Sequence, residues 1–483
     1  MAKNAERSSK SDWNEKKGYA DFILNKMSGM GAEYVEIRVE QGNGDGFLIN
    51  NGNVEAVSFG SDEGLGVRYM INGCLGFFST NMIEKKEINS LIEKSLSSTR
   101  KSRKIGEKIR FSKENASKLT YEVKEKRKIN DIGIDAKLEY VRGIERHLMD
   151  SKANILARTF YYVDSMTDKL YLNSEGSRIE SRIPRIDLFY QFTVKNDGKN
   201  LQRYWQYGVA GGFETIKELD LEKKISREAK ALQDNLKSGV KSPTGMVDVI
   251  VSPEITGIMA HESVGHPYEA DRILGRESAQ AGESFLNPKM IGTRIGKSIV
   301  NVVDEPNIPN SFGYYLYDEE GVKARRKYLI KNGMINELLH NRETANTFGL
   351  QSNGSARATH YGVEPIVRMS NTYVLPGEWK DEEMIRETKR GIYVKNFTEW
   401  NIDDKRWNQK YKGNEAYLIE NGEITKPIRQ PSIEITTPML WSSITAIGKR
   451  VELHAATCGK GEPMQGIPVT MGGPSMKMRI RIN

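Results

Sequence analysis

The segment His261-Glu262-Ser263-Val264-Gly265-His266 places two imidazole groups and a carboxylate within two turns of a helix. Histidine nitrogens are good zinc ligands, and three protein ligands with one open position define a catalytic zinc site. A glutamate beside such a metal can take a proton from the water that the metal activates. The segment therefore predicts a metal centre with His261 and His266 as ligands and Glu262 as base, and the alternative is an ordinary surface helix.

The spacing of the two histidines requires a local distortion of the helix. His261 and His266 are five residues apart, whereas the usual zinc motif spaces its histidines four apart. In a regular α-helix, a separation of five residues would place the side chains about 140° apart around the axis. A π-bulge would bring them to one side, and Gly265 and Pro267 favour such a distortion. The helix should begin at the capping residue Ser252 and follow a strand at 246–251.

A third ligand has several candidates. The chain has two cysteines, Cys74 and Cys458, and composition alone favours a buried inert thiol for each. A thiolate is nevertheless a strong zinc ligand, and glycines follow Cys458. His454 lies four residues before Cys458 and is a rival ligand.

Two carboxylates follow the second histidine closely. Glu269 and Asp271 could be metal ligands or could orient the histidines, and a solvated helix face is an equally good interpretation.

Several blocks of the chain resemble the TldD/PmbA (TldD/TldE) family. The segment 261–271 is similar to the family's HExxxH metal motif, and the remaining blocks follow in the family's order. They are the glycine-rich segments 64–68 and 73–77, the segments 368–377 and 415–427, and the carboxyl-terminal segments 458–460 and 468–474. Because the metal motif is intact, the chain resembles the TldD branch rather than the TldE or PmbA branch.

The resemblance implies a zinc metallopeptidase that acts on unfolded or short peptides. By position, His261, His266 and Cys458 would be the Zn²⁺ ligands and Glu262 the catalytic base that acts with zinc to activate water. The resemblance also implies a homodimer, or a heterodimer with a TldE/PmbA-like paralog. His454 and Thr457 depart from the family pattern, as does the segment 352–364.

Composition indicates a soluble globular protein of several domains. The chain has 483 residues, of which 38% are hydrophobic and 28% are charged. It contains no long apolar run, so no membrane span is expected, and its first residues lack the apolar region of a secretion signal. Two cysteines in so long a chain fit a reducing cytoplasm.

The net charge of +8 arises from 72 basic and 64 acidic residues that are largely interspersed. The densest basic run lies at 100–110, and a second lies at 124–128. A solvated face explains these runs better than nucleic-acid binding, because no motif of a nucleic-acid-binding fold accompanies them. A nucleic-acid-binding module remains the alternative from another functional class, and steeply salt-dependent binding would identify it.

The pattern of elements predicts an α+β fold in two domains. Residues 1–240 should form a mixed amino-terminal domain, and residues 245–483 a strand-rich carboxyl-terminal domain that carries the metal-motif helix. The Gly, Pro and Ser residues of 237–245 mark the boundary. Three Asn-Gly pairs, at 51–52, 332–333 and 421–422, predict hairpin turns.

The first half should contain helices at 12–29, 82–97, 135–151 and 215–236. Its expected strands are 34–40, 46–50, 54–59, 64–71, 155–163, 169–173 and 185–194, with a polar and mobile stretch at 98–131. In the second half, strands are expected at 298–303, 322–330, 335–340, 368–374, 392–397, 416–420 and 423–428.

Two further functions remain open. A catalytically silent scaffold that regulates a paralog would hold its metal with four ligands, and His454 would be the obvious fourth. An amidase acting on small molecules is a weaker rival within the enzymes, and a comparison of amide with peptide substrates would separate the two.

Overall fold

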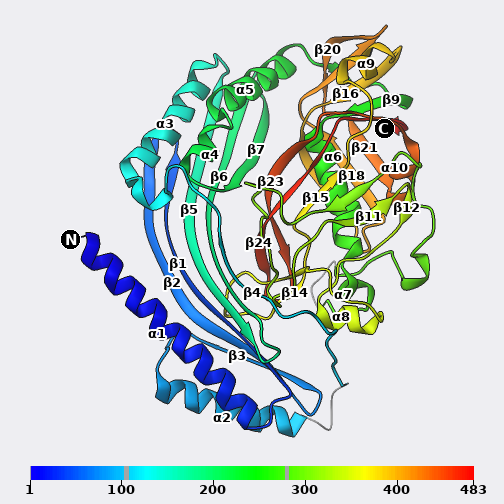
Figure 1. Cartoon of the computed structure of the whole chain (residues 1–483). Coiled ribbons are helices and arrows are strands. Elements are labelled where there is room, and N and C mark those ends of the chain that lie inside the picture. The colour runs from blue at the N-terminus through cyan, green and yellow to red at the C-terminus, as the bar shows by residue number, and fades with distance from the viewer. Residues whose placement is uncertain (1, 103–107, 278–281, 483) are drawn as a thin grey trace.

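The computed structural model describes the backbone of residues 2–102, 108–277 and 282–482. Figure 1 shows an α+β protein in which long curved strands of the first half face a second, strand-rich half. Part of the predicted mobile stretch and of the first basic run, residues 103–107, lies outside the described residues.

The first half of the chain is built on one large sheet. Its strand order is β3-β2-β1-β5-β6-β4 with β7 paired to β6, and the pairs are antiparallel except for β4 with β6. Helices α1 and α2 enclose one core against β1 and β2, whereas α5 packs against β6 and α3 packs against α5 and β5. The elements are α1 Ala2–Gly29, β1 Tyr34–Asn50, β2 Asn53–Ile71, β3 Cys74–Thr80, α2 Lys85–Ser102, β4 Lys118–Glu122, α3 Ile134–Asp150, β5 Ile155–Asn173, β6 Arg178–Asn196, β7 Lys199–Ala210, α4 Phe213–Lys217 and α5 Leu221–Ser238.

The strands of this sheet are longer than the sequence pattern predicts. The expected pair of strands at 34–40 and 46–50 is one strand, β1, and β2 and β5 likewise each join two expected strands. The glycines of β1 lie within a continuous strand. At Gly44 the neighbouring strand comes so close that any side chain would collide with it. A Cβ on Gly44 would lie 2.0 Å from the Asp164 carbonyl oxygen of β5. The expected helix at 215–236 is two helices, separated at Asp220, whose φ is +50°.

The second half contains two larger sheets with helix α6 between them. In the described chain, one sheet has the order β12-β11-β10-β15-β24-β23, and the other includes β9 beside β25 and β16. The strands are β8 Val240–Lys241, β9 Gly245–Val251, β10 Val302–Asp304, β11 Lys327–Lys331, β12 Met334–Ile335, β13 Ala356–Arg357, β14 Ile366–Val367, β15 Asn371–Val374, β16 Arg390–Val394, β17 Phe397–Ile402, β18 Asn408–Gly413, β19 Ala416–Glu420, β20 Glu423–Arg429, β21 Ser432–Thr436, β22 Ile444–Ile447, β23 Glu452–Lys460, β24 Gln465–Gly473 and β25 Met476–Ile482. The α-helices are α6 Pro253–Ala260, α7 Ala270–Ile273, α8 Arg342–Thr347, α9 Asp381–Arg386 and α10 Thr437–Ser443.

Close packing around α6 depends on glycine. A Cβ on Gly257 would lie 2.8 Å from the backbone nitrogen of Gly472 in β24, so the helix could not approach the sheet as closely with a larger residue. This contact fixes the position of the segment that follows α6.

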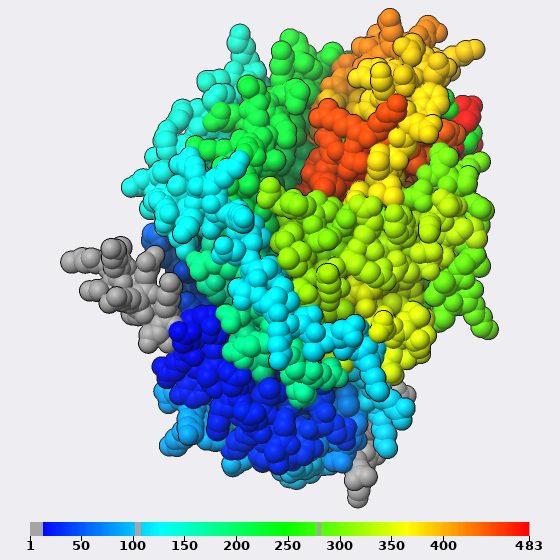
Figure 2. All heavy atoms as spheres, viewed as in Figure 1, coloured from blue at the N-terminus to red at the C-terminus, as the bar shows by residue number. Residues whose placement is uncertain are grey.

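The three Asn-Gly turns are confirmed, and both residues of each pair have positive φ. The strand at 416–420 is confirmed as β19, whereas β7, β23 and β24 are not predicted by the sequence pattern. Figure 2 shows the blue-to-green first half abutting the second half over the face in view. The division into domains 1–240 and 245–483 stays a prediction. In the described part of the chain, no helix is both long and apolar enough to cross a membrane.

Candidate metal centre

The predicted distortion of the helix is present. Ser252 caps α6, since its side chain accepts a hydrogen bond from the backbone N–H of Ile255, and Pro253 occupies the first turn. The helix then passes into a π-helical turn over His261–Gly265 and a 3₁₀ turn over His266–Tyr268. Gly265 has a helical φ of −51°, so it is not needed for unusual dihedral angles. A Cβ there would lie 2.6 Å from Met369 Sδ, so the flexible end of the Met369 side chain would have to shift.

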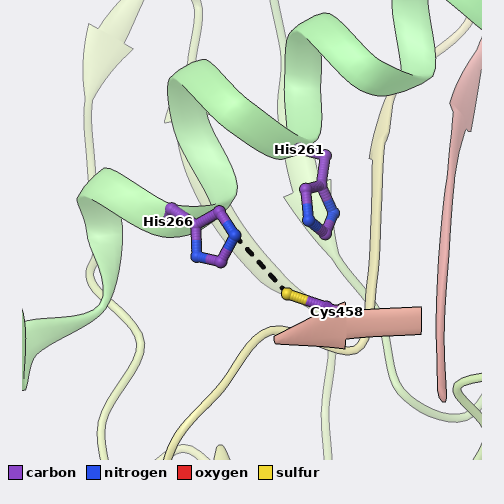
Figure 3. Close-up of side chains that lie close together, drawn as sticks. All are labelled: His261, His266 and Cys458. Carbon is purple, nitrogen blue, oxygen red and sulfur yellow. Dashed lines mark hydrogen bonds between the residues drawn. The ribbon is translucent and has the colours of Figure 1, made fainter. Parts of the chain in front are cut away.

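The π turn brings both histidines to one side of the helix, where they meet Cys458 from β23 (Figure 3). Candidate ligand atoms of these three residues lie within 4.8 Å of one another. His266 Nε2 is 3.4 Å from Cys458 Sγ, and the two imidazole rings are nearly perpendicular, with an interplanar angle of 86°. All three side chains are buried.

His454 does not join this group. It lies in the same strand as Cys458, and four residues of a β-strand span about 13 Å. Its ring packs against Trp205 at a centroid distance of 5.7 Å, and its Nε2 has no hydrogen-bond partner among the described residues. A site with His454 as fourth ligand is therefore not formed in this structure.

The negative charge of Cys458 and the positive charges of the two histidines stabilise each other. Burial alone would raise the pKa of the Cys458 thiol, but the positive charges of His266 and His261 outweigh burial and lower this pKa well below its usual range. Burial alone would lower the pKa of His261, and the negative charge of Cys458 reverses that effect and raises it. A stabilised thiolate is the form of cysteine that binds metals.

Glu262 lines the same pocket and is held at both carboxylate oxygens. Trp400 Nε1 donates a hydrogen bond to Glu262 Oε1 at 3.2 Å, and Arg406 Nη1 donates to Oε2 at 2.7 Å. Trp400 lies in β17, and Arg406 lies in the turn before β18. The side chain of Glu262 is thereby fixed beside the three candidate ligands.

The carboxylate of Glu269 orients His266. Its Oε2 is 3.2 Å from His266 Nδ1 and accepts a hydrogen bond from Arg272 Nε at 2.7 Å. Burial would raise the pKa of Glu269, but the charges of Lys460 and Arg272 lower it well below its usual range. An ionised carboxylate on the outer nitrogen of a histidine fixes the ring and increases its basicity as a ligand.

Asp271 supports this arrangement from further away. It accepts two hydrogen bonds from Lys460 Nζ, at 2.7 and 2.8 Å. Of the two interpretations of Glu269 and Asp271, the solvated helix face is wrong, because both side chains are buried.

A pocket of about 310 Å³ opens beside the cluster. Aromatic side chains from both halves of the chain form much of its wall: Phe189, Tyr204, Trp205, Phe397 and Trp400. Sequence reasoning missed Trp400 and Arg406, which lie in a segment without a recognisable motif, and it gave no role to Lys460 although the segment 458–460 resembles a family block. The arrangement can bind an extended, partly apolar ligand next to a metal and a carboxylate.

The donor set fits zinc. Two imidazoles and a thiolate are typical zinc ligands, and two ligands of a tetrahedral zinc ion lie roughly 3.5 Å apart. The measured separation of 3.4 Å between His266 Nε2 and Cys458 Sγ agrees with this value. His261 Nδ1 is buried without a hydrogen-bond partner among the described residues, which is costly unless a ligand is bound nearby.

Comparisons with known proteins match most of the length of the chain. Family models described as PmbA/TldA metallopeptidase domain 1, central domain and C-terminal domain match residues 35–99, 127–233 and 244–482. A metalloprotease from Methanocaldococcus jannaschii is 32% identical over 91% of this chain and 95% of its own length. A zinc metalloprotease TldD homolog from Saccharolobus solfataricus is 27% identical over 94% of this chain and 97% of its own.

Solved structures share the fold. TldE from Thermococcus kodakarensis superposes with a TM-score of 0.75 and 17% identity, over 96% of this chain and 99% of that one. A candidate modulator of a DNA gyrase from Thermotoga maritima gives a TM-score of 0.76 and 18% identity, over 97% of this chain and 100% of that one.

Proposed function

The chain belongs to the PmbA/TldA metallopeptidase family, and we propose that it is a zinc-dependent peptidase that hydrolyses unfolded or short peptides. The observation that carries this proposal is the convergence of His261, His266 and Cys458 beside Glu262 in one pocket. Three protein ligands leave room for a reacting group, as a catalytic rather than a structural site requires.

In the proposed mechanism His261, His266 and Cys458 hold the metal. When bound, zinc supplies a Lewis acid that activates water and polarises a carbonyl group. Glu262 takes the proton from the attacking water and later returns it to the leaving amine. The hydrogen bonds from Trp400 and Arg406 keep the carboxylate in position, and each oxygen retains a lone pair that can accept the proton.

The shape of the pocket supports an extended peptide as substrate. A volume of about 310 Å³ between the two halves admits a few residues of an unfolded chain but not a folded domain. The aromatic walls favour apolar side chains without selecting a single residue type.

We propose that the protein acts as a dimer, with itself or with a TldE-like paralog. Support comes from an open edge of the large sheet. Strand β2 pairs with β1 along its length, but β3 covers only Leu65–Ile71. On the uncovered part, Val57 is 47% and Phe59 is 71% exposed, and open apolar edges are usually paired in native proteins.

Free Cys74 and Cys458 agree with a reducing, cytoplasmic compartment.

Metal content per chain is the experiment that tests the proposed function. The wild type should bind zinc near stoichiometrically, and His261→Ala and Cys458→Ser should lose it. His454→Ala is a matched control on the strand of Cys458 and should keep its zinc. An unfolded peptide should be hydrolysed, and a stable folded protein should not. If the wild type binds no metal, or if the metal content is the same in the wild type and in both variants, a non-catalytic scaffold would be favoured instead.

A further inference from the structure

Arg406 occupies an unusual backbone position at the edge of the pocket. It has a φ of +63°, a region that non-glycine residues enter at a cost of about 1–3 kcal/mol. The conformation is held by two hydrogen bonds, from Arg406 N to the Asp403 carbonyl at 2.9 Å and from Thr437 Oγ1 to the Arg406 carbonyl at 2.7 Å. Strain maintained in this way often accompanies function.

The guanidinium of Arg406 is only partly used within the protein. Its side chain is 12% exposed and lines the pocket together with the candidate ligands. Nη1 donates to Glu262, whereas Nε is buried without a partner in the described chain. Nη2 also donates no hydrogen bond to any described residue. A guanidinium has five N–H donors in a rigid fork, so donors remain for a ligand that enters the pocket.

Trp400 also positions Glu262, and it does so with a single donor. Its indole N–H donates to Glu262 Oε1, and a tryptophan side chain has no other donor. One N–H of Arg406 is likewise enough to hold the other carboxylate oxygen. Arg406 therefore has hydrogen-bonding capacity beyond the orientation of Glu262, and it lines the same pocket as the candidate metal ligands.

We propose that Arg406 is a catalytic residue whose guanidinium donates a hydrogen bond to the oxyanion formed at the scissile carbonyl while it holds Glu262. This inference rests on the proposed peptidase function. It assigns to one arginine two partners that carry negative charge at different stages of the reaction.

The movement of charge explains why one arginine suits both partners. As the water oxygen bonds to the carbonyl carbon, its proton passes to Glu262, and the carbonyl π pair becomes a lone pair on the oxyanion. Negative charge thus leaves Glu262 and appears on the substrate, and the guanidinium keeps a counter-ion throughout. When the intermediate collapses, the lone pair re-forms the carbonyl, the C–N bond breaks, and Glu262 returns the proton to the amine. An interaction that strengthens only in the transition state accelerates the reaction.

The test compares Arg406→Asn with Trp400→Phe. Asparagine tolerates positive φ, so the turn should survive, and each change removes one hydrogen bond to Glu262. Loss of an oxyanion donor lowers kcat by about 10²–10³-fold. We therefore expect Arg406→Asn to lower kcat by this factor, while KM changes little and the zinc content stays that of the wild type. Trp400→Phe should lower kcat by much less. Equal losses in both variants would reduce Arg406 to a positioning residue and overturn the proposal.

A binding experiment separates the oxyanion contact from any effect on the base. In the Glu262→Gln background, a phosphinic peptide that mimics the tetrahedral anion should bind about 10²-fold more weakly once Arg406→Asn is added. An ordinary peptide should bind both proteins equally. If both ligands weaken alike, the proposal is wrong.

A second variant guards against misfolding. Arg406→Lys keeps the charge beside Glu262 but cannot reach two partners at once, so it should fold, bind zinc and still show reduced kcat. Wild-type activity in Arg406→Lys would contradict the proposal, whereas a wild type that cleaves no peptide would overturn the proposed function as well.

Discussion

The metal pocket can be compared with a second buried group of charges, which we call the seam cluster. The seam cluster joins β1, β2 and β5 of the first half to the second half through Tyr34, Glu36, Arg68, Tyr171, Glu320 and Arg342. Arg68 bridges Glu36 at 2.7 Å and Glu320 at 2.6 Å, and Glu320 also accepts the backbone N–H of Arg342 at 2.6 Å.

The two groups differ in how completely their hydrogen bonds are satisfied. In the described chain, no buried side-chain nitrogen or oxygen of the seam cluster lacks a partner. Around the metal pocket, His261 Nδ1, Glu269 Oε1 and Arg406 Nε all lack one. Buried polar groups are normally paired, so unpaired ones indicate a role beyond folding. The buried polar atoms of the seam cluster therefore satisfy one another, whereas the metal pocket keeps hydrogen-bonding capacity for additional ligands.

The largest expected effect is on the chemistry of the pocket. Glu262→Gln should lower kcat by about 10²–10⁴-fold, because the amide cannot accept a proton from water. Zinc content and the free energy of unfolding should stay close to those of the wild type, since Glu262 is not a proposed ligand. Steady-state kinetics with elemental analysis would check this, and a variant that hydrolyses peptides at the wild-type rate would remove Glu262 from the mechanism.

In the seam cluster, the corresponding change should affect stability instead. Arg68→Met leaves Glu36 and Glu320 buried without their shared counter-ion, and breaking such a pair costs about 3–5 kcal/mol. Urea unfolding should show this loss, while zinc content per folded chain stays unchanged. Lower zinc affinity at full stability would mean that the two clusters are not independent.

The pH dependence of stability should include a contribution from His340, two residues before Arg342. Burial lowers the pKa of His340 to about 4. Above pH ~6.5 the ring is neutral in both states, and between about 6.5 and 4 only the unfolded chain takes the proton. The free energy of unfolding should therefore fall by about 3 kcal/mol as the pH decreases through this window. Urea midpoints at pH 7 and 4.5 should shift less in His340→Gln, and an equal shift would exclude His340 as the cause.

The smallest effect concerns the orientation of a ligand. Glu269→Gln should weaken zinc binding by about 10–100-fold, because loss of the carboxylate on His266 reduces the basicity of the ring. Asp271→Asn is the matched control, because it also contacts Lys460 but not His266. Competition with a zinc chelator would measure both affinities, and equal weakening would show that the whole charge cluster, rather than Glu269 alone, sets the affinity.

Local signals were sufficient for the metal-motif helix. The capping Ser252, the spacing of His261 and His266 and the three Asn-Gly turns depend on neighbouring residues, and the structure confirms each of them. Strand lengths were less predictable. The pattern predicted two strands at 34–40 and 46–50, but these residues form one continuous strand, in which the close approach of β5 requires a glycine at 44.

The sequence by itself determined the pair of histidines, the π turn that unites them and the carboxylate between them, because helix periodicity and capping act over a few residues. The residues alone left Cys458 and His454 as rivals, and the family resemblance favoured Cys458. The tertiary structure brings Cys458, 192 residues from His266, into the cluster and leaves His454 outside it. It also decided that Trp400 and Arg406, 138 and 144 residues from Glu262, hold its carboxylate. These partners depend on strand order and register. A shift of one residue in β23 or β17 would turn Cys458 or Trp400 to the opposite face of its sheet, and Arg406 depends on the turn that joins β17 to β18.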